Sequence, residues 1–107
     1  MKRTDILEKA ARCVSGQREQ DYGIPEDNFS LIASLWTAYT GKSLTAIDVA
    51  MMMSLLKIAR VKTGNSNMDS YVDLAGYAAC AGEIAAIRAA YSDNLTPPKN
   101  VGVGMRK

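Results

Sequence analysis

The chain contains no histidine, which removes both the commonest general base of enzymes and the commonest ligand of transition metals. Its two cysteines, Cys13 and Cys80, lie too far apart in the sequence to form a metal-binding pair. Both occur in apolar helical segments, where cysteine usually packs as a small, reduced hydrophobic residue. The sequence therefore predicts two packed thiols rather than a disulfide, and it identifies no catalytic residue.

Long apolar runs are also missing. None could cross a bilayer, and residues 1–13 lack the apolar core of a signal peptide, so we expect a cytoplasmic protein without a membrane partner. The net charge of +2 is too balanced to indicate a nucleic-acid-binding protein. Apolar side chains, in contrast, make up 48% of the 107 residues. This content predicts one folded domain, and so short a chain favours a core partly shared between the subunits of a homo-dimer or homo-tetramer.

Hydrophobic periodicity predicts helices and no strands, and hence an all-α antiparallel bundle of about four helices. The helix from Thr45 to about Lys62 opens with a capping box, because Asp48 follows the Thr45 cap by three positions. The expected helices cover about residues 4–15, 25–40, 45–62 and 67–91. Residues 1–91 form the predicted domain, and the proline- and glycine-containing residues 92–107 are predicted to be an extended or disordered tail.

Two of the expected helices carry charges within apolar sequence, where an unpaired charge is unfavourable. Lys57 and Arg60 are one turn apart near the end of the third helix. Asp69 and Asp73 begin a stripe on the fourth helix that continues through Gly76, Cys80 and Glu83. The cations suit a helix C-terminus and the acids suit a solvated face. The alternative is that Lys57 and Arg60 contact phosphate, or pair with Asp73 across the helical hairpin.

Four acids are candidate ligands for Mg²⁺, which prefers oxygen donors: Glu26, Asp48, Asp69 and Asp73. Glu26 also suits the first turn of its helix, and Asp48 already has a capping role. Asp48 lies nine residues before Lys57, half a turn out of phase, so these two side chains can enter one site only between two subunits.

Three aromatic residues are candidates to stack on a nucleotide base: Tyr22, Trp36 and Tyr77. Trp36 shares an apolar stripe with Phe29, which favours core packing as the alternative. The run Met51–Met52–Met53 is more typical of an adaptable core or a dimer interface than of a ligand site.

Three motifs follow one another along the chain: Asp21-Tyr22-Gly23, Lys57-x-x-Arg60 and Asp69-x-x-x-Asp73-Leu-Ala-Gly-Tyr77. Together they resemble a family of small phage and prophage proteins related to the all-α, MazG-like nucleoside triphosphate pyrophosphatases. The resemblance covers roughly residues 5–85. It implies a helical dimer or tetramer that binds a nucleotide between helices, with Mg²⁺ held by acids.

The chain departs from the MazG-like pattern at the first acidic motif, Glu-Glu-x-x-Glu, where its helix offers only Asp48. So few carboxylates are poorly suited to position several metal ions and activate a water. We therefore expect a protein that binds or sequesters a nucleotide or a nucleotide-derived signal. The alternatives are a Mg²⁺-dependent nucleotide pyrophosphohydrolase and a protein–protein adaptor.

Overall fold

The computed structural model describes residues 1–15, 25–64 and 68–95. Within these ranges the chain forms four helices and no strand, which confirms the all-α prediction. The helices are α1 (Arg3–Cys13), α3 (Pro25–Thr40), α4 (Ala46–Lys62) and α5 (Met68–Leu95). Helix α5 extends four residues beyond the predicted end at residue 91, and the remainder of the predicted tail lies outside the described residues.

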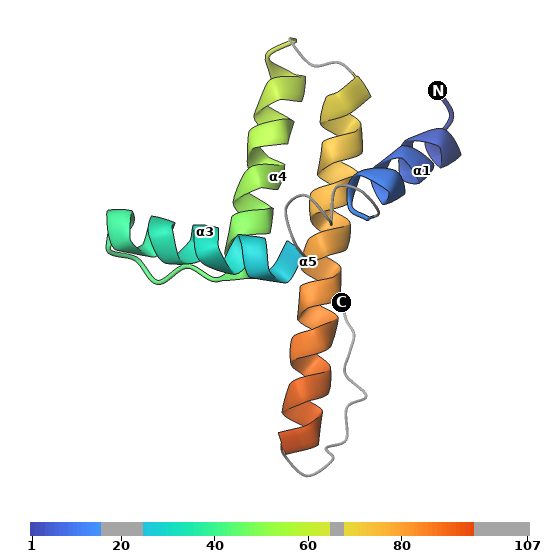
Figure 1. Ribbon diagram of the computed structural model, residues 1–107. Helices are drawn as coiled ribbons and strands as arrows, with labels where there is room; N and C mark the ends of the chain where they lie inside the picture. The colour runs from blue at the N-terminus through green and yellow to red at the C-terminus, as the bar shows by residue number, and fades with distance from the viewer. Residues whose placement is uncertain (16–24, 65–67, 96–107) are drawn as a thin grey trace.

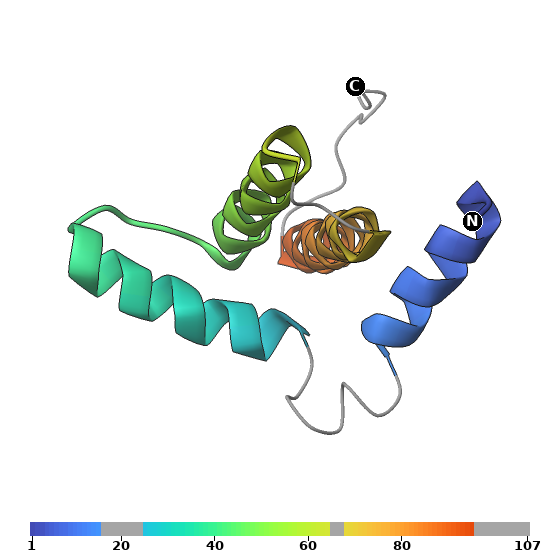
Figure 2. The same cartoon turned by 90° about the horizontal axis from the view of Figure 1, so that it is seen from above.

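Helices α4 and α5 run antiparallel, side by side, and form the centre of the molecule (Figure 1). Helix α3 crosses the beginning of α4 instead of lying along it, so the arrangement differs from a regular bundle of aligned helices. Helix α1 packs on α5, on the side away from α4 (Figure 2). None of the described helices is long and apolar enough to cross a membrane.

The start of α4 is fixed by the predicted capping box. The Thr45 hydroxyl accepts a hydrogen bond from the Asp48 backbone N–H at 3.1 Å, and the Thr45 N–H donates to the Asp48 carboxylate at 2.8 Å. These two bonds satisfy amide groups that have no partner within the helix. The capping role expected for Asp48 is therefore confirmed.

Glycines mark the ends of α3 and α4. Gly41 has a φ of +75° and Gly64 a φ of +81°, a backbone region that side-chain-bearing residues rarely adopt. The Gly41 N–H donates to the Thr37 carbonyl at 2.9 Å, which closes the last turn of α3. The chain can then turn into the short connection that leads to Thr45.

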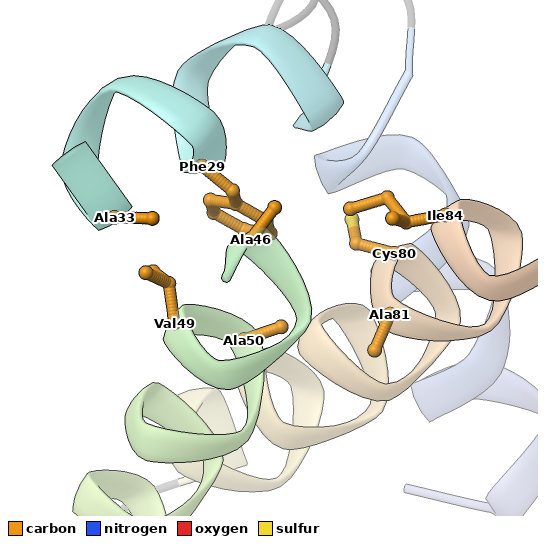
Figure 3. Close-up of a cluster of buried hydrophobic side chains, with 8 residues drawn as sticks. All are labelled: Phe29, Ala33, Ala46, Val49, Ala50, Cys80, Ala81 and Ile84. Atoms are coloured by element: carbon orange, nitrogen blue, oxygen red, sulfur yellow. The ribbon is translucent and has the colours of Figure 1, made fainter. Parts of the chain in front are cut away.

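The core lies where α3, α4 and α5 meet (Figure 3). Its buried members are mostly small, and they are Phe29, Ala33, Ala46, Val49, Ala50, Cys80, Ala81 and Ile84. Small side chains allow the helix axes to approach closely, and Val49 and Ile84 fill the space that remains. Trp36 and Tyr77 are half-buried against this cluster, which confirms core packing for Trp36.

Helix α5 extends past the helices that cover its first half (Figure 1). Ile84 is 1% exposed in the core, whereas Ile87, one turn later, is 49% exposed. Both residues are isoleucines of the same helix, so the difference in their exposure comes from the neighbouring helices.

Replacing Ile84 with alanine should lower the free energy of unfolding by about 2–4 kcal/mol, because it leaves a cavity in the core. Ile87→Ala, the matched control, should cost less than about 1 kcal/mol. Denaturant titration followed by circular dichroism measures both values, and equal losses would contradict the core described above.

Helix α1 approaches α5 at Gly76, where a Cβ atom would lie 3.3 Å from the Val14 Cγ1 atom. A Cβ at Gly82, on the same helix, would have no neighbour within 4 Å. Alanine is favoured over glycine inside a helix by about 1 kcal/mol.

Gly82→Ala should therefore stabilise the protein by about 0.5–1 kcal/mol. Gly76→Ala should gain less, or destabilise, because the Val14 side chain at the end of α1 must move by a few tenths of an ångström. Thermal unfolding of both variants measures the difference; an equal gain would show that α1 does not pack tightly on α5.

Candidate functional site

The candidate site is centred on an ion pair between α4 and α5. The Lys57 Nζ lies 2.9 Å from the Asp73 Oδ2, and the two side chains are 17% and 37% exposed. The antiparallel arrangement produces this contact, because it brings the last turns of α4 beside the first turns of α5. Of the accounts that the sequence left open, pairing across the hairpin is present in the structure.

Burial of Lys57 follows from its position on α4. It projects from the same side of the helix as the buried residues Ala46, Ala50 and Ser54, which face the rest of the molecule. A lysine there must bury its aliphatic stem and find a partner for its ammonium group. Asp73 is that partner, so the charge persists at the edge of the core.

Arg60 lies one turn after Lys57 and is exposed. Its guanidinium makes no ion pair with any described residue. The structure therefore places one anchored cation and one open cation on neighbouring turns at the same end of α4.

A second ion pair was missed by the sequence reasoning. The Lys9 Nζ on α1 lies 3.8 Å from the Asp69 Oδ1 on α5, with 42% and 69% of the side chains exposed. Only the packing of α1 onto α5 brings these residues together, and no spacing in the sequence connects residue 9 with residue 69. At this distance and exposure the pair contributes little to stability.

The predicted acidic stripe of α5 is divided between different environments. Asp69 faces Lys9 of α1, Asp73 faces Lys57 of α4, and Glu83 is exposed. Cys80, within the stripe, is buried, and this burial raises the pKa of its thiol; the nearby Glu83 carboxylate raises the pKa further. Both cysteines are free, as expected.

Of the candidate metal ligands whose side chains the structure describes, Asp69 and Asp73 are one turn apart on α5, whereas Asp48 lies on α4. Among the described residues, no group of three or more histidine, cysteine, aspartate or glutamate side chains could hold a metal ion. Asp48 caps α4 nine residues before Lys57, about 13 Å along the helix axis, and so lies far from Asp73. The Glu26 side chain lies outside the described part of the chain.

The three candidate aromatic residues lie in different places. Tyr77 follows Asp73 by one turn of α5 and is half-buried, with its ring centroid 6.1 Å from that of Phe29. Trp36 packs against the core from α3, which crosses the opposite end of α4 from Lys57. Tyr22 lies outside the described residues. Of the two that the structure describes, Tyr77 is on the same helix as Asp73, and its ring lies toward Phe29 of α3.

Comparison with known proteins identifies relatives over most of the chain. Residues 5–85 match the family described as Domain of unknown function (DUF6378). The Gene 55 protein of Mycobacterium phage D29 is 49% identical over 75 residues, which cover 70% of this chain and 50% of that protein. The Gene 55 protein of Mycobacterium phage L5 is 50% identical over 74 residues, 68% of this chain and 47% of that protein.

The chain thus spans about half the length of the curated relatives that it matches. No solved structure matches it. These findings confirm similarity to phage proteins, whereas the relationship to MazG-like pyrophosphatases stays a prediction.

A double-mutant cycle should separate the two ion pairs. We expect Lys57→Met and Asp73→Asn to show a coupling energy of about 1 kcal/mol, because their pair is short and half-buried. For Lys9→Met and Asp69→Asn the coupling should be about 0.3 kcal/mol or less. Unfolding free energies of the single and double variants provide the test, and a larger coupling for the Lys9 pair would contradict this assignment.

Proposed function

The chain belongs to the DUF6378 family, and we propose that it binds a nucleotide, or a nucleotide-derived signal, between α4 and α5. The observation that carries this proposal is the half-buried Lys57, held 2.9 Å from Asp73 at the junction of the two helices. Binding without rapid turnover would sequester the ligand. The proposed place of action is the cytoplasm of a bacterial host, in keeping with the phage relatives.

Lys57 suits a phosphate contact because its position is already fixed. An ammonium group has three donors, and one bond to Asp73 leaves two for phosphate oxygens. Asp73 holds the flexible side chain in place, so less conformational entropy is lost when an anion binds. Asp73 is thus an orienting residue in this proposal.

Arg60 and α5 add further attraction for an anion. The exposed Arg60 guanidinium matches phosphate with two parallel N–H donors. The first turn of α5, next to the last turns of α4, provides the partial positive charge of a helix N-terminus. Tyr77, one turn beyond Asp73, is the aromatic we assign to the base, with Tyr22 as a further candidate.

Hydrolysis is the less supported activity. Among the described residues, no cluster of acidic side chains is large enough to form a metal site by itself. In this proposal Mg²⁺ would therefore enter with the nucleotide phosphates. The proposal also includes a MazG-like fold and a homo-oligomeric state. The resemblance to the MazG-like proteins implies both, together with a nucleotide site between helices.

Nucleotide binding is tested by thermal-shift screening of linear and cyclic nucleotides with Mg²⁺, followed by calorimetric titration. A ligand at 100 times its Kd should stabilise the protein by about 2.7 kcal/mol. For a domain of this size that corresponds to a rise in Tm of roughly 10 °C. Lys57→Ala and Arg60→Ala should each weaken binding at least about ten-fold, because each removes a charged hydrogen bond to phosphate.

Lys62→Ala is the matched control, since Lys62 is also a cation of the last turn of α4 but projects from the side opposite Lys57. It should leave the affinity nearly unchanged. The proposal fails if no nucleotide raises the Tm, which would favour the protein–protein adaptor. Release of pyrophosphate that is abolished by Asp73→Asn would instead establish the pyrophosphohydrolase.

A further inference from the structure

The outer face of α4 is apolar, and its large side chains are exposed. Helices α3 and α5 lie on two adjacent sides of α4, and no described helix covers the side away from both (Figure 2). Five large apolar side chains of α4 are 42–64% exposed: Met51, Met52, Leu55, Leu56 and Ile58. A monomer rarely exposes a continuous apolar patch of more than a few hundred Å² without a partner for it.

The spacing of these residues is that of a helix–helix seam. Met51, Leu55 and Ile58 follow one another at intervals of four and three, the pattern by which one helix packs along another. The same intervals continue to Asp48 at one end and Lys62 at the other. The seam is therefore apolar in the middle and carries opposite charges at its two ends.

This charge pattern fits a second copy of the same helix in the antiparallel direction. Asp48 and Lys62 each lie seven residues from Leu55, almost in line with it on the helix surface. A two-fold axis at Leu55 places Asp48 of each copy opposite Lys62 of its partner. A parallel pairing would instead place like charges together.

The residues that would face each other also complement one another in size and in their remaining capacity for ion pairs and hydrogen bonds. The same axis places Met51 opposite Ala59, so a long flexible side chain meets a small one. Lys62 makes no ion pair within the described part of the chain. The Asp48 carboxylate uses one oxygen for the Thr45 cap and keeps further acceptor sites.

We infer that α4 of one copy packs antiparallel against α4 of a second copy about a two-fold axis at Leu55, with Asp48–Lys62 ion pairs at both ends. Self-complementarity of one surface is what a two-fold interface requires. This interface uses the side of α4 opposite Lys57, so it stands independently of the proposed nucleotide site.

Sedimentation velocity over a dilution series tests the interface, with circular dichroism as the check of folding. The unmodified chain should associate, and Leu55→Lys should raise the dimer Kd at least about 100-fold, because two charges meet on the axis. Leu31→Lys is the matched control: Leu31 is 60% exposed on α3 and Leu55 is 64% exposed on α4. It should leave the Kd within about two-fold of the unmodified value.

Lys62→Glu, at an exposed end of the helix, tests the orientation without disturbing the core. It places like charges opposite each other twice and should raise the Kd about ten-fold, less so at high salt. A chain that stays monomeric throughout, a Leu55→Lys variant that associates normally, or equal dissociation by Leu31→Lys would overturn the interface. An unchanged Kd for Lys62→Glu would overturn the antiparallel direction.

Discussion

Close packing of α4 against α5 is the constraint on which the other features of this molecule depend. Small buried residues on both helices, such as Ala50 and Ala81, let the two backbones approach, and Val49 and Ile84 complete the core. The antiparallel direction then decides which ends meet. It brings the basic end of α4 beside the acidic start of α5 and thereby creates the contact between Lys57 and Asp73.

A consequence of this packing is that α4 has two unlike sides. The side toward α5 and α3 carries the small core residues together with Lys57, a cation that is retained because a carboxylate meets it. The outer side carries large apolar residues around Leu55 and has charges only at its ends. One helix of 17 residues therefore serves both proposals, and each uses a different side.

The small core of a single copy is consistent with an outer side of α4 that packs against a second copy. Half of its buried residues are alanines, which remove little apolar surface from water, while leucine and methionine side chains stay exposed on α3 and α4. A chain of this size buries a limited share of its surface by itself. Covering the α4 face with a second copy would add apolar burial where the single chain lacks it.

Much of the local structure was predictable from the sequence, because its causes are local. Hydrophobic periodicity identified the helices, and the Thr45–Asp48 capping box located the start of α4. The pairing of Lys57 with Asp73 was also among the interpretations that the sequence left open, since a short connection between neighbouring helices favours a hairpin.

The sequence by itself determined the helical class, the helix ends and the charges that a hairpin could bring together. Only the tertiary structure decided that Ile84 rather than Ile87 is buried, and that Asp69 of α5 lies beside Lys9 of α1. It also separated Asp48 from Asp73 by more than two turns of α4. The physical reason is that capping and periodicity depend on residues within a few positions, whereas burial and charge pairing depend on helices that are distant in the chain.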